Sequence, residues 1–255
     1  MTDRRRFLAR AVAGTAALLL SGCTDLSQKK WVVDLLGEVE NLTRRAQRLF
    51  AGSHALAPEF KKADIAPVFR ANGTTDPSTA DYNTQAANGF RDWRIVVDGL
   101  VEKRLSLSLA ELRAMPSRTQ ITRHDCVEGW SCIGQWTGTP LALVLAAAQP
   151  KPEARYVVFH CADNMAEPDE PESLYYESLD LLEATHPQTI LAYDLNGAPL
   201  PIANGAPVRL RAERQLGYKM AKYIKRIELV SDLSQIGSGK GGYWEDQGYT
   251  WWGGI

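Results

Sequence analysis

Residues 121–138 read ITRHDCVEGWSCIGQWTG and bring two cysteines, a histidine, two acidic residues and two tryptophans into one short segment. The stretch RTQITRHDC, residues 118–126, predicts a β-strand that carries Cys126 at its end. A thiol here has two ordinary explanations, since buried cysteines often serve as small apolar side chains and cysteines of exported proteins often pair in disulfides. A chemical role for Cys126 therefore needs a pattern of its own.

Three common uses of cysteine and histidine do not fit the spacing. Cys126 and Cys132 have five residues between them, so they form no CxxC pair, and the chain has no HExxH helix, which removes support for a zinc site. A cysteine hydrolase would need a base and an orienting partner, for which His124, His160 and His186 are available in number only. The sequence contains no CxxCH motif, so we expect no covalent c-type haem.

The composition of the whole chain predicts one sizeable core. The chain has 255 residues, of which 45% are hydrophobic, and a formal net charge of -1. A nearly neutral chain without a long basic block lacks the positive surface that nucleic-acid binding requires. We therefore expect one catalytic domain and no nucleic-acid partner.

Residues 1–23 have the form of a signal peptide. Three arginines at positions 4–6 precede an apolar stretch over residues 11–20. That stretch is shorter than the roughly 20 apolar residues that span a bilayer, so a permanent transmembrane anchor is the weaker interpretation. Residues 3–8, DRRRFL, resemble the twin-arginine export signal, although an ordinary Sec signal also begins with positive charge.

The end of this segment, Leu20-Ser21-Gly22-Cys23, resembles the bacterial lipobox, in which the cysteine is lipidated and becomes the first residue of the mature protein. The alternative is a chance cysteine near a cleavage site. The twin-arginine route exports folded proteins, typically with a cofactor already loaded. We expect a periplasmic or extracytoplasmic protein, with a lipid anchor at Cys23 if the lipobox is used.

Residues 24–60 are predicted to form an amphipathic helix and a linker, and residues 61–255 the catalytic domain. Between residues 29 and 50, apolar residues recur at alternating steps of four and three, the spacing of one helix face. They are Leu35, Val39, Leu42, Ala46 and Leu49. The helix would end near Gly52-Ser53 and would either pack on the domain or hold it off the membrane.

The catalytic domain is predicted to mix strands and short helices without a regular βαβ repeat, which favours an α+β fold over a doubly wound sheet. We expect strands within residues 93–101, 118–126, 154–162, 188–197, 206–213 and 221–230. Short helices are expected after the capping box at Ser108–Glu111, after a cap at Thr139-Pro140, and within residues 178–187. Residues 67–89 are predicted to be a loop, and the Gly- and aromatic-rich tail 237–255 an irregular cap over the domain.

Two separate motifs resemble one known family. RHDCVEGWS (123–131), followed by QWTGTPL (135–141), resembles the active-site segment of sulfite-oxidase-type molybdopterin enzymes, in the branch of the periplasmic methionine sulfoxide reductases. Residues 203–229 match that family's [NH]GxPxR motif followed by GxxxxK. The resemblance extends from about Ile65 to Val230. It implies the family's molybdopterin-binding fold, with mixed sheets and short helices.

The resemblance also implies a site. Cys126 would be the thiolate ligand of molybdenum, beside the ene-dithiolate sulfurs of one molybdopterin. The pterin groove would be lined by Asn72, Thr75, Asp76, Asn204, Arg209, Met220, Ala221 and Lys222. Of these, Arg209 and Lys222 would hold the phosphate. Cys161 stands where some relatives have a pterin-contacting threonine, and it could instead pair with Cys132 in a disulfide after export.

The implied reaction is two-electron oxygen-atom transfer, with electrons exchanged with a separate redox partner, a membrane haem protein or a soluble cytochrome. Sulfite oxidisers of the family favour arginines after the metal cysteine, whereas Glu128 and Trp130 stand here. Asp125 and Glu128 would repel a dianion, offset by Arg123 and His124 alone, so we expect reduction of a small S-oxide or N-oxide. Either Trp130 or Trp136 would form an apolar wall.

Three alternatives remain at this stage. The carboxylates near Cys126 could point away from the pocket, leaving selectivity to residues 163–177. The chain could be a sulfite dehydrogenase. It could also be a non-catalytic lipoprotein that keeps the fold without the cofactor.

Overall fold

The computed structural model describes residues 29–52, 55–167 and 169–255. The predicted signal peptide and Cys23 lie outside the described residues. The chain divides into two compact units, residues 1–50 and 51–255. Within the described residues no helix is both long and apolar enough to cross a membrane.

The first unit contains the amphipathic helix that the apolar spacing predicts. Helix α2 spans Lys30–Ala51, so the prediction of a helix ending near Gly52 is confirmed. Val39, Leu42 and Leu49 on its apolar face are exposed.

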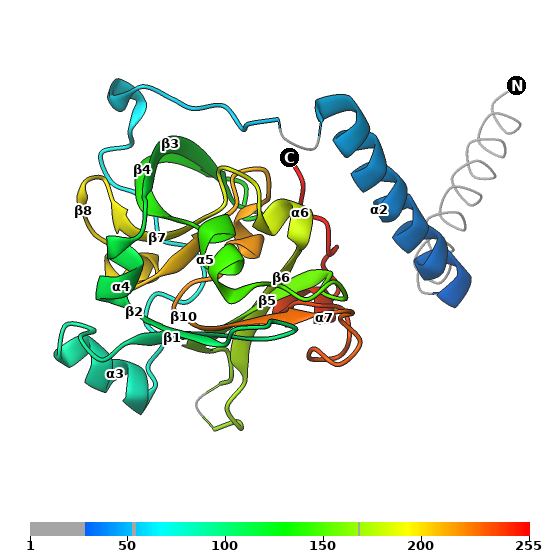
Figure 1. The fold of residues 1–255 in the computed structure, drawn as a ribbon. Helices are drawn as coiled ribbons and strands as arrows, with labels where there is room; N and C mark the ends of the chain where they lie inside the picture. The colour runs from blue at the N-terminus through cyan, green and yellow to red at the C-terminus, as the bar shows by residue number, and fades with distance from the viewer. Residues whose placement is uncertain (1–28, 53–54, 168) are drawn as a thin grey trace, which may run out of the picture. The chain divides into compact units, whose positions relative to one another are not determined.

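The second unit is built on two five-stranded sheets (Figure 1). The first has the strand order β2-β1-β10-β5-β6, and the second has the order β3-β4-β7-β8, with β9 also paired to β7. The strands of the first sheet are β1 (Arg94–Gly99), β2 (Leu105–Ser108), β5 (Tyr156–Asn164), β6 (Leu174–Asp180) and β10 (Ile224–Val230). Those of the second are β3 (Arg118–Asp125), β4 (Ser131–Pro140), β7 (Ile190–Leu195), β8 (Ala198–Pro199) and β9 (Arg209–Arg211).

Strand pairing confirms the predicted α+β class. Strand β1 pairs parallel with β10 and antiparallel with β2, so the first sheet is mixed. Short helices α4 (Leu109–Ala114), α5 (Leu141–Ala148) and α6 (Leu181–Ala184) connect strands, while α3 (Ala80–Ala87) precedes β1 and α7 (Tyr243–Asp246) follows β10. Three 3-10 turns complete the unit: η1 (Lys62–Asp64), η2 (Ile202–Asn204) and η3 (Gly217–Lys219).

The main core packs α5 against the first sheet and also includes residues of β7 and β9 from the second sheet. Leu141 and Val144 of α5 are fully buried in one cluster with Val97, Phe159 and Ile227 from three strands of that sheet. Burying a large aliphatic or aromatic side chain contributes about 1.5–3 kcal/mol, so this packing stabilises the unit. A smaller cluster around Trp136 and Phe69 covers the second sheet.

The loop predicted over residues 67–89 is wrong in part, because α3 lies inside it. Thr79 caps this helix by accepting a hydrogen bond from the backbone N–H of Tyr82. Tyr82 is buried, and its hydroxyl donates to the carbonyl of Ala206 at 2.7 Å. A single apolar anchor holds the helix, so its sequence shows no apolar periodicity.

Strand β4 was not expected from the sequence, although it is the longest strand. Its buried face alternates through Cys132, Gly134, Trp136 and Gly138, so two of its buried positions carry no side chain. A Cβ at Gly138 would lie 2.3 Å from the carbonyl oxygen of Leu191, which shows that β4 and β7 approach too closely for any other residue. Close backbone approach therefore hides the strand pattern.

The helix starts are predicted with one error. Ser108 and Glu111 form the expected capping box of α4. Thr139 does not cap α5, because its hydroxyl donates to the carbonyl of Leu112 at 2.8 Å, and Pro140 takes the N-cap position without a side-chain bond.

The C-terminal tail, residues 237–255, lies against the domain as the aromatic content predicts. The hydroxyl of Tyr218 donates to the carbonyl of Thr250 at 2.8 Å, and the indole of Trp251 donates to Ser178 at 2.8 Å. Gly254 pairs with Gln215 in an isolated bridge. We call residues 237–255 the C-terminal cap.

Candidate functional site

A tight loop at the end of β3 presents the thiol of Cys126. The backbone N–H of Cys126 donates to the carbonyl of Trp130 at 2.9 Å, and that of Gly129 donates back to the carbonyl of Cys126 at 3.1 Å. Gly129 has a φ of 83°, a conformation that glycine adopts without strain. Cys126 is half-buried, and burial raises the pKa of its thiol.

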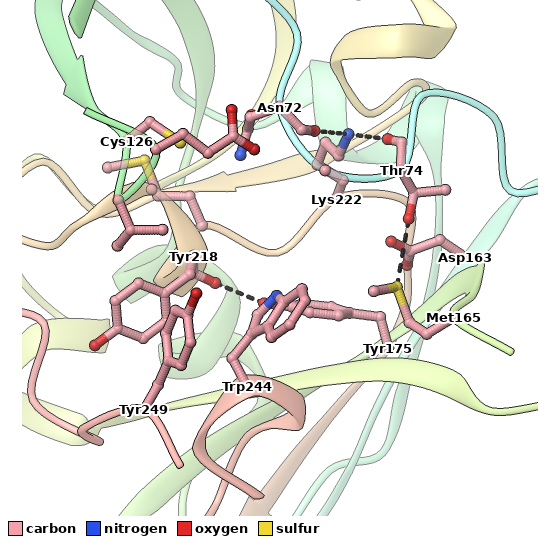
Figure 2. A pocket seen from close by; sticks show the side chains of 15 residues that line it. Asn72, Thr74, Cys126, Asp163, Met165, Tyr175, Tyr218, Lys222, Trp244 and Tyr249 are labelled. Carbon is pink, nitrogen blue, oxygen red and sulfur yellow. Dashed lines mark hydrogen bonds between the residues drawn. The ribbon is translucent and has the colours of Figure 1, made fainter. Parts of the chain in front are cut away.

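The thiol of Cys126 lies in a pocket with about 690 Å³ of empty space, counting the open solvent at its mouth. Figure 2 shows Cys126 at one end and Asp163 at the other, with Asn72 and Lys222 along one side and Tyr218, Trp244 and Tyr249 along the opposite side. The lining comes from residues 72–74, residues 126–128, Asp163 and Met165 at the end of β5, Tyr175 of β6, and parts of residues 217–222 and 244–249. The loop at the end of β3 therefore faces the C-terminal cap across the pocket.

Lys222 fixes the loop that closes one side of the pocket. Its ammonium donates to the carbonyls of Asn72 at 2.7 Å, Ala203 at 3.3 Å and Thr74. Burial and the charge of Arg209 lower the pKa of Lys222 to about 7. Because three carbonyls accept from the ammonium, the protonated form is the one that holds this loop.

The structure brings four of the predicted site residues together in one pocket. Asn72, Cys126, Met220 and Lys222 line the pocket. Four others are buried: Cys161, Asn204, Arg209 and Ala221.

Arg209 is placed differently from the prediction. It is 0% exposed, and it donates to the carbonyls of Asn204 at 3.0 Å and Met220 at 3.2 Å. Its guanidinium does not line the pocket; its hydrogen bonds tie the turn at Asn204 to the turn at Met220, which does line it.

Thr75 and Asp76 lie outside the pocket and are exposed. The side chain of Asp76 accepts from the backbone N–H of Ser78 at 3.0 Å and so serves the local turn. Their neighbour Thr74 lines the pocket instead, and its hydroxyl donates to the sulfur of Met165 at 3.3 Å. The residues predicted to line the pocket in this loop lie one to two positions after Thr74, which does line it. The length of this loop is not fixed by the family resemblance, so the resemblance could not show which residue faces the pocket.

Two residues that line the pocket, Asn72 and Asp163, each have a buried Oδ1 without a hydrogen-bond partner within the described part of the chain. His124 Nε2 and Asn204 Nδ2, which are buried outside the pocket lining, have no partner there either. An unpaired buried polar group costs about 1–3 kcal/mol, so such a cluster indicates a site built for a ligand. Arg209 and Lys222 add buried positive charge beside it. The residues present therefore fit a polar, anionic group of the molybdopterin type.

Asp163 was missed as a site residue. Its carboxyl lines the end of the pocket away from Cys126, and burial raises its pKa to about 7 against the opposing effect of Lys222. The available signal was its place at the end of a strongly apolar strand, where an acidic residue has no structural reason to be buried.

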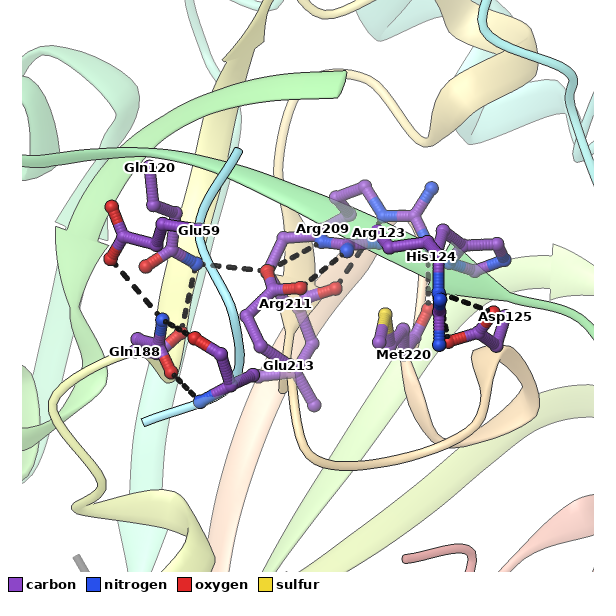
Figure 3. Close-up of polar contacts among 12 residues, drawn as sticks. Glu59, Gln120, Arg123, His124, Asp125, Gln188, Arg209, Arg211, Glu213 and Met220 are labelled. Carbon is purple, nitrogen blue, oxygen red and sulfur yellow. Dashed lines mark hydrogen bonds and ion pairs between the residues drawn. The ribbon is translucent and has the colours of Figure 1, made fainter. Parts of the chain in front are cut away.

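His124 belongs to a buried polar network on β3 and β9, which Figure 3 shows. Arg211 donates to its Nδ1 at 2.9 Å, which leaves the ring proton on Nε2. Arg211 also pairs with Glu213 at 2.6 Å, and Gln120 donates to Glu213 at 2.8 Å. Burial and the neighbouring cations hold the pKa of His124 well below its usual range, so His124 offers no positive charge to a substrate.

Three expectations about the surroundings of Cys126 need correction. Asp125 pairs with Arg123 at 2.9 Å and does not line the pocket, so of the two flanking carboxylates only Glu128 faces it. Trp136 is 0% exposed beneath Arg211 and cannot form a wall. Trp130 also lies outside the pocket lining, and its indole donates to Glu128 at 2.9 Å.

The disulfide considered between Cys132 and Cys161 is not formed. Both are buried free thiols. Cys132 lies on β4 in the smaller core cluster, and Cys161 lies on β5 of the other sheet in the main core. Each packs as a small apolar side chain.

The comparisons with known proteins fit this site. A model of the oxidoreductase molybdopterin binding domain matches residues 82–236. The chain belongs to this family, which confirms the inference from the two sequence motifs. It is a molybdopterin-dependent oxidoreductase.

The chain is 36% identical over 253 residues to the putative protein-methionine-sulfoxide reductase subunit YedZ1 of Azospira oryzae, covering 98% of this chain and 87% of the relative. It is 38% identical over 170 residues to the protein-methionine-sulfoxide reductase catalytic subunit MsrP of Xanthomonas axonopodis pv. citri, covering 63% of this chain and 51% of the relative. It thus matches about half the length of MsrP. A solved structure, the sulfane dehydrogenase SoxCD from Paracoccus pantotrophus, is similar at 22% identity and a TM-score of 0.48, covering 56% of this chain and 39% of that one.

Replacing Lys222 with glutamine is expected to lower the molybdenum content of the purified protein roughly tenfold or more, a typical loss when a supporting contact of a metal site is removed. The uncharged amide cannot replace the ammonium that ties residues 72–74 to the pocket. Metal analysis of protein from a molybdopterin-producing host measures the effect. Lys225→Gln is the matched control, because Lys225 lies outside the pocket lining and makes a partly exposed ion pair with Asp81. Equal metal content in both variants would show that Lys222 does not hold the cofactor.

Proposed function

We propose that this protein reduces an S-oxide or N-oxide by oxygen-atom transfer, with molybdenum-molybdopterin as its cofactor and the thiolate of Cys126 as a ligand of the metal. The observation that carries the proposal is the thiol of Cys126 in a pocket with unpartnered buried polar atoms. A soft thiolate suits such a metal, and metal binding removes the thiol proton. When bound, the cofactor supplies a two-electron redox centre. For a sulfoxide substrate, two electrons and two protons convert the sulfoxide to the thioether and one water molecule.

The residues around the pocket have distinct roles in holding this cofactor. The carboxylate of Asp163 and the amide of Asn72 offer acceptors to the N–H groups of a pterin ring, and the amide of Asn204 offers a donor. Lys222 supplies positive charge to the phosphate. Arg209 acts indirectly, because its hydrogen bonds to the carbonyls of Asn204 and Met220 hold the backbone at these two residues in place.

The charge at the mouth favours a neutral substrate. Glu128 lines the pocket beside Cys126, and its carboxylate is 3.8 Å from Arg70, with both side chains more than half exposed. A dianion such as sulfite would meet this carboxylate, whereas a neutral oxide would not. The names of the two methionine-sulfoxide reductase relatives support an S-oxide as the substrate.

The electrons would come from a separate one-electron carrier, a membrane haem protein or a soluble cytochrome. The twin-arginine-like signal at residues 3–8 and the lipobox-like Cys23 support an extracytoplasmic, lipid-anchored enzyme. Export of the folded, loaded protein would place the pocket in the same compartment as its oxide substrate.

Steady-state assays in both directions test the proposed function. With a reduced dye as electron donor, the loaded protein is expected to turn over methionine sulfoxide. With an artificial electron acceptor, little oxidation of sulfite is expected, because Glu128 opposes binding of the dianion. Efficient sulfite oxidation without reduction of any S-oxide or N-oxide would show that the proposed direction of the reaction is wrong.

A further inference from the structure

We infer that helix α2 (Lys30–Ala51) binds the surface of an anionic phospholipid bilayer, with its apolar face among the lipid headgroups and its arginines at the lipid phosphates. The inference goes beyond the lipid anchor proposed at Cys23, because it assigns a membrane contact to side chains of the protein itself. It does not depend on which reaction the pocket carries out.

Exposed apolar side chains are concentrated on α2. Among the described residues, thirteen large apolar side chains are exposed, and five of them lie on this 22-residue helix: Trp31, Val39, Leu42, Leu49 and Phe50. Leu49 is 79% exposed and Phe50 is 86% exposed. Single exposed apolar residues are ordinary, whereas a contiguous group of them marks an interaction surface.

The five side chains share one face of the helix. With about 3.6 residues per turn, each residue is rotated by about 100° from the one before it, so the directions of Trp31, Leu42 and Leu49 agree within about 20°. Val39 and Phe50 lie about 80–100° to one side of them. The apolar face is therefore about 100° wide and runs from the first turn of α2 to the last.

The charges of α2 complement an anionic surface. Its second half carries Arg44, Arg45 and Arg48, and it has no acidic residue after Glu40. Arg45 is exposed and lies about 40° from Leu49 around the helix, on the side away from Phe50. A long basic side chain at the border of an apolar face can reach lipid phosphates while its methylene groups stay on the apolar side.

A second copy of the helix is the main competing occupant of this face, because Val39, Leu42 and Leu49 also fit the spacing of a coiled coil. A coiled coil buries a narrow seam and usually carries charged residues on either side of it. On α2, Trp31 and Phe50 occupy positions beside that seam. Aromatic residues there widen the apolar face, and tryptophan is enriched where lipid meets water. The composition of the face therefore favours a bilayer surface.

Binding at α2 would also complete the proposed anchoring. A single acyl chain holds a protein on a membrane only reversibly, and stable attachment takes a second signal. An amphipathic helix shortly after the predicted lipid at Cys23 provides such a signal. It would keep the enzyme at the surface from which the proposed membrane haem carrier delivers electrons.

Co-sedimentation with vesicles tests the inference on the molybdenum-loaded mature chain, residues 23–255, in which Cys23→Ser removes the acyl site. The vesicles are phosphatidylcholine alone and phosphatidylcholine mixed with phosphatidylglycerol. One variant carries Leu42→Gln and Leu49→Gln, and a second carries Arg45→Gln and Arg48→Gln. The matched control carries Leu56→Gln and Leu174→Gln, because both are exposed leucines outside α2. Sedimentation equilibrium gives the oligomeric state, and molybdenum content and dye-linked activity are measured for each protein.

We expect the wild-type chain to bind the phosphatidylglycerol vesicles more tightly than the neutral ones. The double leucine variant should bind the anionic vesicles at least about tenfold more weakly, since it loses two apolar side chains from the face. The double arginine variant should lose roughly tenfold on anionic vesicles and little on neutral ones. The control variant should bind like the wild type, and all variants should keep their molybdenum and their activity.

Three results would overturn the inference. The first is no binding of the wild-type chain to anionic vesicles, or binding that the leucine variant leaves unchanged. The second is a wild-type dimer that the leucine variant dissociates while vesicle binding is absent, which would make a second copy the occupant. The third is loss of molybdenum in the leucine variant, which would show that the face packs on the catalytic unit. Vesicle binding through α2 by a protein that reduces no oxide would refute only the proposed function.

Discussion

Cys126→Ala is expected to lose oxide reduction by at least about a thousandfold, because the variant removes the atom that the proposed mechanism places on the metal. The fold should persist, since Cys126 is half-buried in a loop and its backbone makes the hydrogen bonds that shape that loop. We expect the free energy of unfolding to change by less than about 1 kcal/mol. Dye-linked kinetics and chemical denaturation measure the two effects.

Cys132→Ala separates the role of the metal ligand from that of a structural thiol. Cys132 is buried in the smaller core cluster, so its loss should cost about 1–2 kcal/mol of stability. Its activity should match that of the wild type, because it lies outside the pocket lining. Activity in Cys126→Ala near the wild-type level would contradict the assignment of the ligand.

The second large effect concerns a buried ion cluster beneath the C-terminal cap. Lys219 donates to Glu177 and to Glu245 at 2.5 Å each, and all three side chains are almost fully buried. In Lys219→Met the two carboxylates would face each other without a cation. Removing one partner of a buried ion pair costs about 3–5 kcal/mol, so we expect the free energy of unfolding to fall by that amount at neutral pH.

The pH dependence of this variant has a definite sign. Burial raises the pKa of Glu177 well above its usual range, and the variant lacks the lysine that opposes this shift. A carboxyl whose pKa is raised on folding stabilises the protein below its unfolded pKa, and that contribution is lost as the pH rises through the folded pKa. Lys219→Met should therefore lose more stability at pH 8 than at pH 5.

Two further variants control for the loss of a lysine side chain and for its charge. Lys225→Met should change the stability by less than about 0.5 kcal/mol, because Lys225 makes a partly exposed ion pair. Adding Glu177→Gln and Glu245→Gln to Lys219→Met should restore most of the lost stability. Urea denaturation across pH gives all of these values. A loss that is independent of pH and unrelieved by the glutamines would show that packing, not charge, explains it.

The secondary-structure elements that have a clear local sequence pattern were predicted correctly. Strand β3 and the loop at Cys126 follow from residues 118–126, and the capping box at Ser108 sets the start of α4. Strand β4 was not predicted because Gly134 and Gly138 stand at buried positions where other elements approach closely. Such close approaches arise from the tertiary structure and leave no apolar pattern in the sequence. Helix α3 stayed hidden because its one buried anchor, Tyr82, finds its partner far along the chain.

The residues of the candidate site also fall into those that a sequence motif indicated and those that only the structure revealed. Motifs of fixed spacing indicated Cys126 and Lys222, which line the pocket, and Asn204, which is buried. Asp163 was marked only by its place at the end of an apolar strand, and Trp244 reaches the pocket through the folding of a distant segment, so no motif indicated either residue. Trp136 illustrates the reverse error, because a tryptophan near the thiol in sequence proved to be buried under Arg211.

Whether Cys126 binds molybdenum is tested most directly by elemental analysis and X-ray absorption on protein from a molybdopterin-producing host. These methods give the metal content and the number of sulfur ligands around the metal. The wild type should hold about one molybdenum atom per chain, and Cys126→Ser should show one sulfur fewer around any metal it retains, since serine offers a hard oxygen in place of the soft thiolate. Wild-type protein without molybdenum, or an unchanged sulfur shell in the variant, would contradict the account.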